Sequence, residues 1–297
     1  MTGHRNAKRA FFSLLCALLL LGGMRRPAQA GEVKVDKDVV FGTVQGVKLL
    51  LDVYQPDGFA GKRPGIVLVH GGGFMFGDKS FYAPMAHHLA EKGYVAYSVN
   101  YRFAPQFHYP AQIDDVQRAI RWIRAHADTY QLDPERLGAL GDSAGGYLVA
   151  MLGIRDTRDN SDMDLAKYSS RVQCVVDLYG PTDFTIPAAK AAVSSQAIYL
   201  LTQYFGKPQE EAMDLYKEGS PIIYVDAKSA PFLILHGTTD PLVPCDQSQR
   251  LYDALKTSGV EATLLLLYKQ AHGFLKPADP QQAGVLADDF FAKHLKP

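Results

Sequence analysis

The chain has 297 residues, of which 47% are hydrophobic and 21% are charged. This composition is typical of a globular protein and excludes collagen-like, low-complexity and disordered chains. The formal net charge is zero, but the first 30 residues carry five basic residues and no acidic ones, which leaves 26 basic against 31 acidic residues in the remainder. A mildly acidic body without a basic stripe argues against nucleic acid as a partner.

The first 30 residues have the order of parts found in an export signal. A basic polar end is followed by the apolar run Phe11–Leu21, which is too short to cross a bilayer of about 30 Å as a helix. The segment ends in Ala28-Gln29-Ala30, a small-residue pattern that signal peptidases cleave. We predict a signal peptide over residues 1–30, cleaved before Gly31, and a secreted or periplasmic mature chain of residues 31–297. An uncleaved anchor or a buried core helix is the alternative.

The body begins as a hairpin around the turn Gln45-Gly46 and continues as strands alternating with helices. Short apolar runs predict strands covered on both faces, and apolar residues three or four positions apart predict amphipathic helices. This alternation predicts one α/β domain with a mostly parallel sheet and helices on both faces. In chain order the predicted elements are strands Val39–Val44, Val47–Tyr54 and Ile66–Val69, helix Tyr82–Glu91, strand Val95–Val99, helix Gln112–Ala127, strand Arg136–Leu140, helix Ala144–Leu152, strands Val172–Leu178, Phe232–Leu235 and Ala262–Leu267, and helix Ala283–His294.

The segment Thr182–Gly219 interrupts this alternation. It contains five aromatic residues but no strand-like run. Long insertions between sheet elements are usually functional or disordered, and this one is too aromatic for disorder. We interpret it as a partial lid over a site at the strand ends, with a surface excursion that has its own small core as the alternative.

The motif Gly141-Asp142-Ser143-Ala144-Gly145 lies between a predicted strand and a predicted helix. It matches G-x-S-x-G, in which a tight strand-to-helix turn exposes a nucleophilic serine. Trypsin-like proteases contain a similar string, but they are all-β proteins in which the histidine and the aspartate precede the serine, whereas this setting requires them to follow it. Ser143 is therefore the predicted nucleophile.

The loop His70-Gly71-Gly72-Gly73 directly follows a predicted strand. Consecutive glycines allow a backbone to approach a ligand closely, so we expect an oxyanion hole here rather than a flexible turn. We assign its donors to the amides of Gly71, Gly72 and Ala144, while the sequence leaves open which two of the three glycines donate. The His70 side chain is expected to orient the loop.

The general base is predicted to be His272, because it comes just after the last predicted strand. The other histidines lie in the N-terminal segment, on helices or in loops. His236 ends the strand Phe232–Leu235 and is interpreted as a buried turn residue, and His108 as a solvated loop residue.

The acid must lie between the nucleophile and the base in the sequence. Asp240 fits, because it follows the strand Phe232–Leu235 in a short loop restrained by a nearby glycine and proline. Asp183, which follows the strand Val172–Leu178, is the rival. Asp142 is adjacent to the nucleophile and is expected to make a local hydrogen bond instead.

These motifs make the chain resemble an α/β-hydrolase of the bacterial hormone-sensitive-lipase-like group, and more narrowly the bifunctional feruloyl and acetyl-xylan esterases. The resemblance covers about Val39 to Leu295 and implies an α/β-hydrolase fold, a Ser143–Asp240–His272 triad, and oxyanion donors at Gly71, Gly72 and Ala144. Phe74 stands where many relatives have tryptophan after the glycines. The resemblance is carried by Asp52–Pro56, His70–Phe74, Gly77–Lys79, Gly141–Gly146, Ser220-Pro221, His236–Pro244 and His272–Phe274.

We therefore expect a serine carboxylic ester hydrolase that forms an acyl-serine intermediate on short-chain or aromatic (acetyl or feruloyl) esters of small molecules or polysaccharides. No cofactor is expected. Cys174 and Cys245 have no CxxC partner, so no zinc site is expected. Because Cys174 lies in a predicted buried strand, we favour free thiols, with a disulfide between the two as the alternative. Two other functions are a peptidase or amidase of the same fold, whose relatives often carry a large N-terminal propeller, and a non-catalytic ligand-binding homologue, which would have lost the base.

Overall fold

The computed structural model describes residues 32–58, 61–156, 162–187, 193–274 and 280–296. The predicted signal peptide lies outside these residues. The strands are β1 (Val33–Val44), β2 (Val47–Pro56), β3 (Arg63–Val69), β4 (Val95–Val99), β5 (Leu132–Asp142), β6 (Cys174–Leu178), β7 (Phe232–Gly237) and β8 (Ala262–Leu267). The helices are α1 (Ala83–Glu91), α2 (Ala111–Ala125), α3 (Ala144–Ile154), α4 (Ser195–Phe205), α5 (Met213–Glu218), α6 (Asp246–Thr257) and α7 (Pro280–Leu295).

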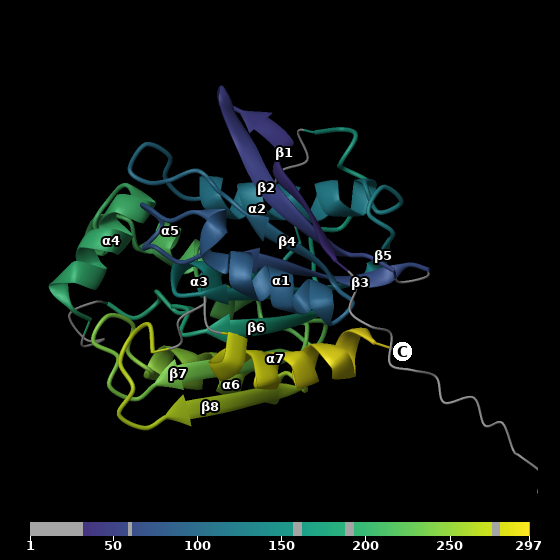
Figure 1. Ribbon diagram of the computed structural model, residues 1–297. Coiled ribbons are helices and arrows are strands. Elements are labelled where there is room, and N and C mark those ends of the chain that lie inside the picture. Colours follow the sequence, from purple (N-terminus) through teal and green to yellow (C-terminus); the bar gives the residue numbers. More distant parts are fainter. Residues whose placement is uncertain (1–31, 59–60, 157–161, 188–192, 275–279, 297) are drawn as a thin grey trace, which may run out of the picture.

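Across the described residues the strands form one eight-stranded sheet in the order β1-β2-β4-β3-β5-β6-β7-β8 (Figure 1). The β1/β2 and β2/β4 pairs are antiparallel, and the pairs from β4/β3 onward to β7/β8 are parallel. The predicted α/β class with a mostly parallel sheet is confirmed. Because parallel strands all point the same way, the carboxyl ends of β3, β5, β7 and β8 lie along one edge, where ligands bind in such sheets.

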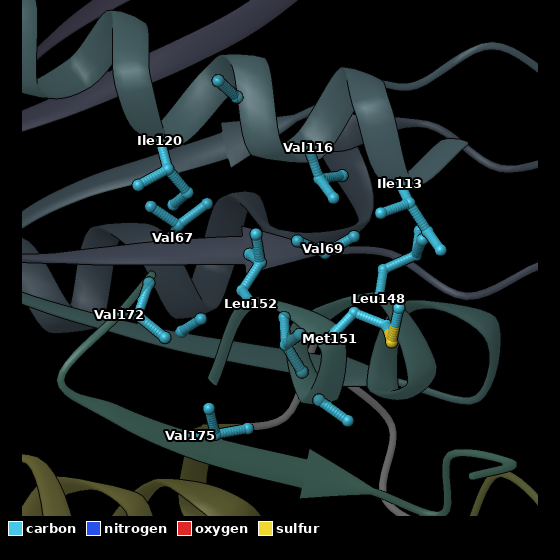
Figure 2. Packing of buried hydrophobic residues seen from close by; sticks show 14 of the residues in the cluster. Val67, Val69, Ile113, Val116, Ile120, Leu148, Met151, Leu152, Val172 and Val175 are labelled. Carbon is cyan, nitrogen blue, oxygen red and sulfur yellow. The ribbon is translucent and has the colours of Figure 1, made fainter. Parts of the chain in front are cut away.

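Helices cover both faces of the sheet. Buried side chains of α1 and α7 pack on one face, and those of α2, α3 and α6 pack on the other. Figure 2 shows α2 presenting Ile113, Val116 and Ile120 toward β3 and α3. These side chains are fully buried, and each contributes about 1.5–3 kcal/mol through burial.

The local sequence explains the elements that were predicted closely. All seven residues of β3 are buried, as expected of a strand covered on both faces. Helix α2 carries Asp114 in its first turn and Arg124 in its last. These charges favour helix formation, because each lies at the end of the helix where the dipole has the opposite sign. Strand β8 has the predicted bounds.

Three helices were missed. Helices α4 and α5 lie in the Thr182–Gly219 segment, where only the absence of strands was foreseen. Helix α6 was missed because it is mostly polar and buries few apolar side chains, among them Leu251 and Leu255. Its position beside β8 depends on tertiary packing, which overrides a weak local signal.

Candidate active site

The nucleophile lies on a strained backbone turn between β5 and α3. Ser143 has φ 52° and ψ −119°, a region that non-glycine residues occupy only when the surrounding structure imposes it. The turn is closely packed: a Cβ atom on Gly145 would lie 2.0 Å from the Val69 carbonyl oxygen, and one on Gly141 would lie 2.4 Å from the Gly145 carbonyl oxygen. The flanking glycines are therefore required by the backbone, as the G-x-S-x-G pattern predicts.

The structure brings Ser143, His272 and Asp240 together from the ends of three strands. The Ser143 Oγ lies 2.9 Å from His272 Nε2, and His272 Nδ1 lies 2.6 Å from Asp240 Oδ2. Because an ionised carboxylate only accepts, the proton of the neutral imidazole belongs on Nδ1, which leaves Nε2 free to accept from the serine hydroxyl. This arrangement can remove a proton from the serine.

Asp240 is held as an anion. Burial alone would raise the pKa of Asp240, but hydrogen bonds from His236, from His272 and from the Val243 amide outweigh burial and hold that pKa well below its usual range. Its Oδ1 atom accepts from the amides of Leu242 at 2.8 Å and Val243 at 2.9 Å. The negative charge opposite His272 therefore persists at any pH where the protein works.

The rival acid, Asp183, does not contact the base. Its Oδ2 atom lies 2.8 Å from Arg250 Nε, and its Oδ1 atom accepts from the amide and the hydroxyl of Thr185. Asp183 instead lines a cavity that opens beside Ser143. Between the two acids left open by the sequence, only Asp240 reaches the imidazole.

The glycine loop requires one correction. The Gly71 amide, which was expected to point at the oxyanion, donates to Asp142 Oδ1 at 3.0 Å, so that part of the prediction is wrong. Asp142 Oδ1 also accepts from the Tyr82 hydroxyl at 2.9 Å. Burial raises the pKa of the Asp142 carboxyl, and the bonds from Tyr82 and Gly71 oppose that rise. Asp142 therefore anchors the loop across the sheet edge.

The other candidate donors are the amides of Gly72, Gly73 and Ala144. Ala144 is the first residue of α3, so its amide has no carbonyl one turn earlier within the helix. Gly73 lines the same cavity as Ser143 and Ala144. Gly72 lies between Gly73 and Gly71, whose amide donates to Asp142.

The His70 side chain contacts the glycine loop and holds it in place. Its ring stacks on Tyr101 with centroids 4.6 Å apart, and its Nδ1 lies 2.8 Å from the Gly71 carbonyl oxygen. Burial lowers the pKa of His70, so the ring is neutral. The Tyr101 hydroxyl donates to the His70 carbonyl at 2.9 Å. The expectation that His70 orients the loop agrees with these contacts.

A cavity of about 560 Å³ opens beside Ser143, and its walls are mostly apolar. The glycine loop contributes Phe74, and the β7–α6 loop contributes Leu242 and Val243. The segment Thr182–Gly219 supplies one wall through Phe184, Ile198, Leu200, Leu201, Met213 and Tyr216. The cavity has room for an aromatic or short aliphatic group next to the nucleophile.

The Thr182–Gly219 wall is anchored by an aromatic cluster. Tyr204 stacks on Phe74 with centroids 3.8 Å apart, and Phe205 lies 4.0 Å from Tyr216. These rings belong to the main core rather than to a separate one. The segment therefore both borders the cavity and packs on the body of the protein.

No set of three or more His, Cys, Asp or Glu residues in the described part of the chain is arranged to hold a metal ion. Cys174 is buried and Cys245 is partly buried, and both are free thiols. In the ranges that the structure covers, no helix is long and apolar enough to cross a membrane.

Two contributors to the site were underestimated from the sequence. His236 is buried as expected, but its Nε2 atom also lies 3.3 Å from Asp240 Oδ2. Asp142 makes, besides a local hydrogen bond, a contact across 71 positions of the chain. A histidine that ends a buried strand four residues before the acid was the available signal for His236.

Comparisons with known proteins agree with this geometry. The BD-FAE family model matches residues 51–255. The probable carboxylic ester hydrolase LipM of Mycobacterium tuberculosis is 30% identical, over 92% of this chain and 68% of its own length. The chain spans between 51% and 57% of the length of three further curated relatives.

Solved structures show the same fold. A truncated carbohydrate esterase from gut microbiota has a TM-score of 0.74 and 27% identity, and the alignment covers 91% of this chain and 99% of that one. The esterase Est2 of Thermogutta terrifontis, solved with butyrate bound, has a TM-score of 0.74 and 28% identity, with coverage of 91% and 96%. The expected α/β-hydrolase fold is confirmed.

Proposed function

The chain belongs to the BD-FAE family, and from this premise we propose that it is a serine carboxylic ester hydrolase that uses Ser143, His272 and Asp240. The observation that carries the proposal is the unbroken line of hydrogen bonds from Ser143 Oγ through the imidazole to Asp240, beside an apolar cavity. A positioned base within 3 Å or so of a serine hydroxyl is what nucleophilic catalysis requires.

The first half of the reaction forms an acyl-serine. Ser143 Oγ attacks the ester carbonyl carbon while His272 Nε2 takes the hydroxyl proton. We propose that the amides of Gly72, Gly73 and Ala144 donate hydrogen bonds to the carbonyl oxygen as it gains negative charge. The Gly71 amide is not available for this role, because it donates to Asp142. When the carbon–oxygen bond to the alcohol breaks, Nε2 returns its proton to the departing oxygen.

The second half repeats these steps with water. Nε2 takes a proton from the water as it attacks the acyl carbon, and the tetrahedral intermediate collapses. The bond to Ser143 Oγ breaks, the proton on Nε2 passes to that oxygen, and the carboxylic acid leaves. Asp240 remains ionised throughout and stabilises the imidazolium that forms in each half.

The cavity favours esters with acetyl, other short acyl or aromatic acyl groups, such as feruloyl, as substrates. Its apolar walls favour a group without charge, and the anchored Thr182–Gly219 wall acts as the partial lid that encloses it. Esters on polysaccharides fit an exported enzyme, and we propose that residues 1–30 direct that export. N-terminal sequencing of the mature protein tests the export proposal, with Gly31 as the expected first residue.

Turnover of p-nitrophenyl acetate by the purified mature protein tests the proposed activity. We expect release of p-nitrophenol by the wild type, little hydrolysis of a peptide amide, and no release by Ser143→Ala. Hydrolysis of the amide at a comparable rate would favour a peptidase. Absence of turnover on acetate, methyl ferulate and acetylated xylan alike would indicate a non-catalytic binding protein.

A further inference from the structure

A second imidazole contacts the carboxylate of the acid. His236 is the fifth residue of β7, and its side chain is fully buried. Its Nε2 atom lies 2.9 Å from the Val243 carbonyl oxygen and 3.3 Å from Asp240 Oδ2, and its Nδ1 atom lies 2.6 Å from Ser248 Oγ on α6. Every polar atom of this buried ring therefore has a partner.

The partners determine where the proton of His236 sits. A backbone carbonyl only accepts, so the proton of the neutral ring is on Nε2, and Nδ1 accepts from the Ser248 hydroxyl. The Nε2–H group points between the Val243 carbonyl and Asp240 Oδ2. The same oxygen accepts the stronger bond from His272 Nδ1 at 2.6 Å. Asp240 Oδ2 thus lies between two imidazole N–H donors.

We propose that His236 is a positioning residue that shares the charge of Asp240 with His272 and thereby sets how strongly His272 holds a proton. A donor on one lone pair of a carboxylate makes it a weaker acceptor at the other, because the charge is already partly neutralised. Without His236, the full charge of Oδ2 faces His272. The effect on rate rests on the proposed function, whereas the effect on the hydrogen bond does not.

The other charged and titratable groups around the pair are few among the described residues. Tyr179, just after β6, packs its ring 4.9 Å from the His272 ring and 6.5 Å from the His236 ring. Asp177 on β6 acts on His236 through its field, and Asp142 at the end of β5 is within the field of His272. These groups are the same in the wild type and in the His236 variants. A difference in the pH profile between the wild type and a variant therefore reports on His236.

The test compares His236→Leu with His236→Gln in the mature protein. Leucine removes the N–H donor, and glutamine keeps an amide donor of similar reach. In the leucine variant we expect the acid limb of the kcat/KM profile to move to higher pH by about half to one unit. On that limb kcat/KM at a given pH should fall by about three- to tenfold, because a smaller fraction of His272 is unprotonated. The glutamine variant is expected to recover most of both changes.

A spectroscopic readout makes the test independent of turnover. The proton between His272 Nδ1 and Asp240 lies in a hydrogen bond of 2.6 Å, so we expect it to give a low-field NMR resonance. We expect this resonance to move further downfield in His236→Leu, because the bond to Asp240 strengthens. Ser248→Ala weakens His236 as a donor without removing it, so it should move both readouts in the same direction by less. This milder variant decides the matter if His236→Leu does not fold.

The matched control is His88→Leu. His88 Nε2 lies 2.8 Å from Asp288 Oδ2, so it is also a histidine paired with a carboxylate, but it lies between α1 and α7 and does not contact the site. It is expected to leave the acid limb and the resonance unchanged. An unchanged limb and resonance in folded His236→Leu and Ser248→Ala would overturn the inference. If the wild type shows no ester turnover, the proposed function fails, and the resonance alone still decides the role of His236.

Discussion

The two halves of the site are held in different ways. At the ends of β3 and β5, the nucleophile turn is positioned by close approaches of the backbone, such as that of Gly145 to the Val69 carbonyl. At the ends of β7 and β8, Asp240 and His272 are positioned by hydrogen bonds between side chains and loop amides. Strand β6 separates the halves in the sheet.

This difference teaches where each half is vulnerable. The backbone half tolerates no added atoms, because its atoms are already in contact. The side-chain half tolerates small changes in shape, but it depends on where protons sit. Steric substitutions should therefore break the first half, and changes of charge or hydrogen-bond polarity should break the second.

The largest expected effect comes from Ser143→Ala. Loss of the nucleophile should lower kcat by roughly 10⁴- to 10⁶-fold, while Tm stays near that of the wild type because the turn is held by its neighbours. The measurement is p-nitrophenyl acetate turnover alongside thermal unfolding. Near-normal activity in a folded variant would show that Ser143 is not the nucleophile.

In the side-chain half, Asp240→Asn should lower kcat by up to about 10⁴-fold, because the amide can donate to His272 and favour the wrong tautomer. Asp183→Asn is the matched control: it removes the charge opposite Arg250, so it should lower Tm and leave kcat within a few-fold of wild type. Steady-state kinetics on the same ester compare them. Greater loss of kcat in the Asp183 variant would contradict the assignment of the acid.

In the backbone half, Gly145→Ala should destabilise the fold by about 3 kcal/mol or more, since its Cβ would overlap the Val69 carbonyl oxygen at 2.0 Å. Gly259→Ala serves as control. Gly259 has φ +77° but open space around its Cβ position, so only backbone strain of about 1–2 kcal/mol applies. Urea unfolding measures both, and equal losses would mean that close packing does not limit the nucleophile turn.

Between the halves, Asp177→Asn should stabilise the protein by about 1–3 kcal/mol at neutral pH. Burial raises the pKa of Asp177 from 3.8 to about 6, and its Oδ2 atom has no hydrogen-bond partner among the described residues. A carboxyl whose pKa is higher in the folded than in the unfolded state binds more protons when folded, so stability falls as pH rises from about 4 to 6.

Asparagine does not titrate, so this fall should disappear from the variant. Urea unfolding at pH 4, 5, 6 and 7 measures it. A uniform loss of stability at every pH would instead show that the fold requires the carboxylate of Asp177.

The smallest expected effect concerns the acyl group. Each methylene that fits in the cavity adds about 0.8 kcal/mol of burial, or roughly fourfold in kcat/KM. We expect straight-chain p-nitrophenyl esters to peak at about two to four acyl carbons, since the anchored Thr182–Gly219 wall resists overpacking at about 1–3 kcal/mol. A steady rise toward long chains, or activation by a lipid interface, would make the cavity an open lipid channel.

The predictions from sequence succeeded where the pattern is local. The apolar run of β3, the periodicity of α2 and the G-x-S-x-G turn each express a constraint within about one element, so each was placed in the right part of the chain, although β3 begins at Arg63 rather than Ile66. The Gly71 assignment failed because its partner, Asp142, is distant in the chain and comes near only when β3 and β5 pair. Nothing near Gly71 in the sequence indicates that contact.

By itself, the sequence determined the α/β class, the order of the strands and of helices α1, α2, α3 and α7, and the residue types available for ester hydrolysis, because hydrophobic period and turn chemistry act over a few residues. Tertiary structure alone decided that the Gly71 amide is engaged by Asp142 and that His236 contacts the same carboxylate as His272. Those outcomes depend on which strand ends become neighbours and on the directions of buried side chains, and both are set by packing of the whole sheet.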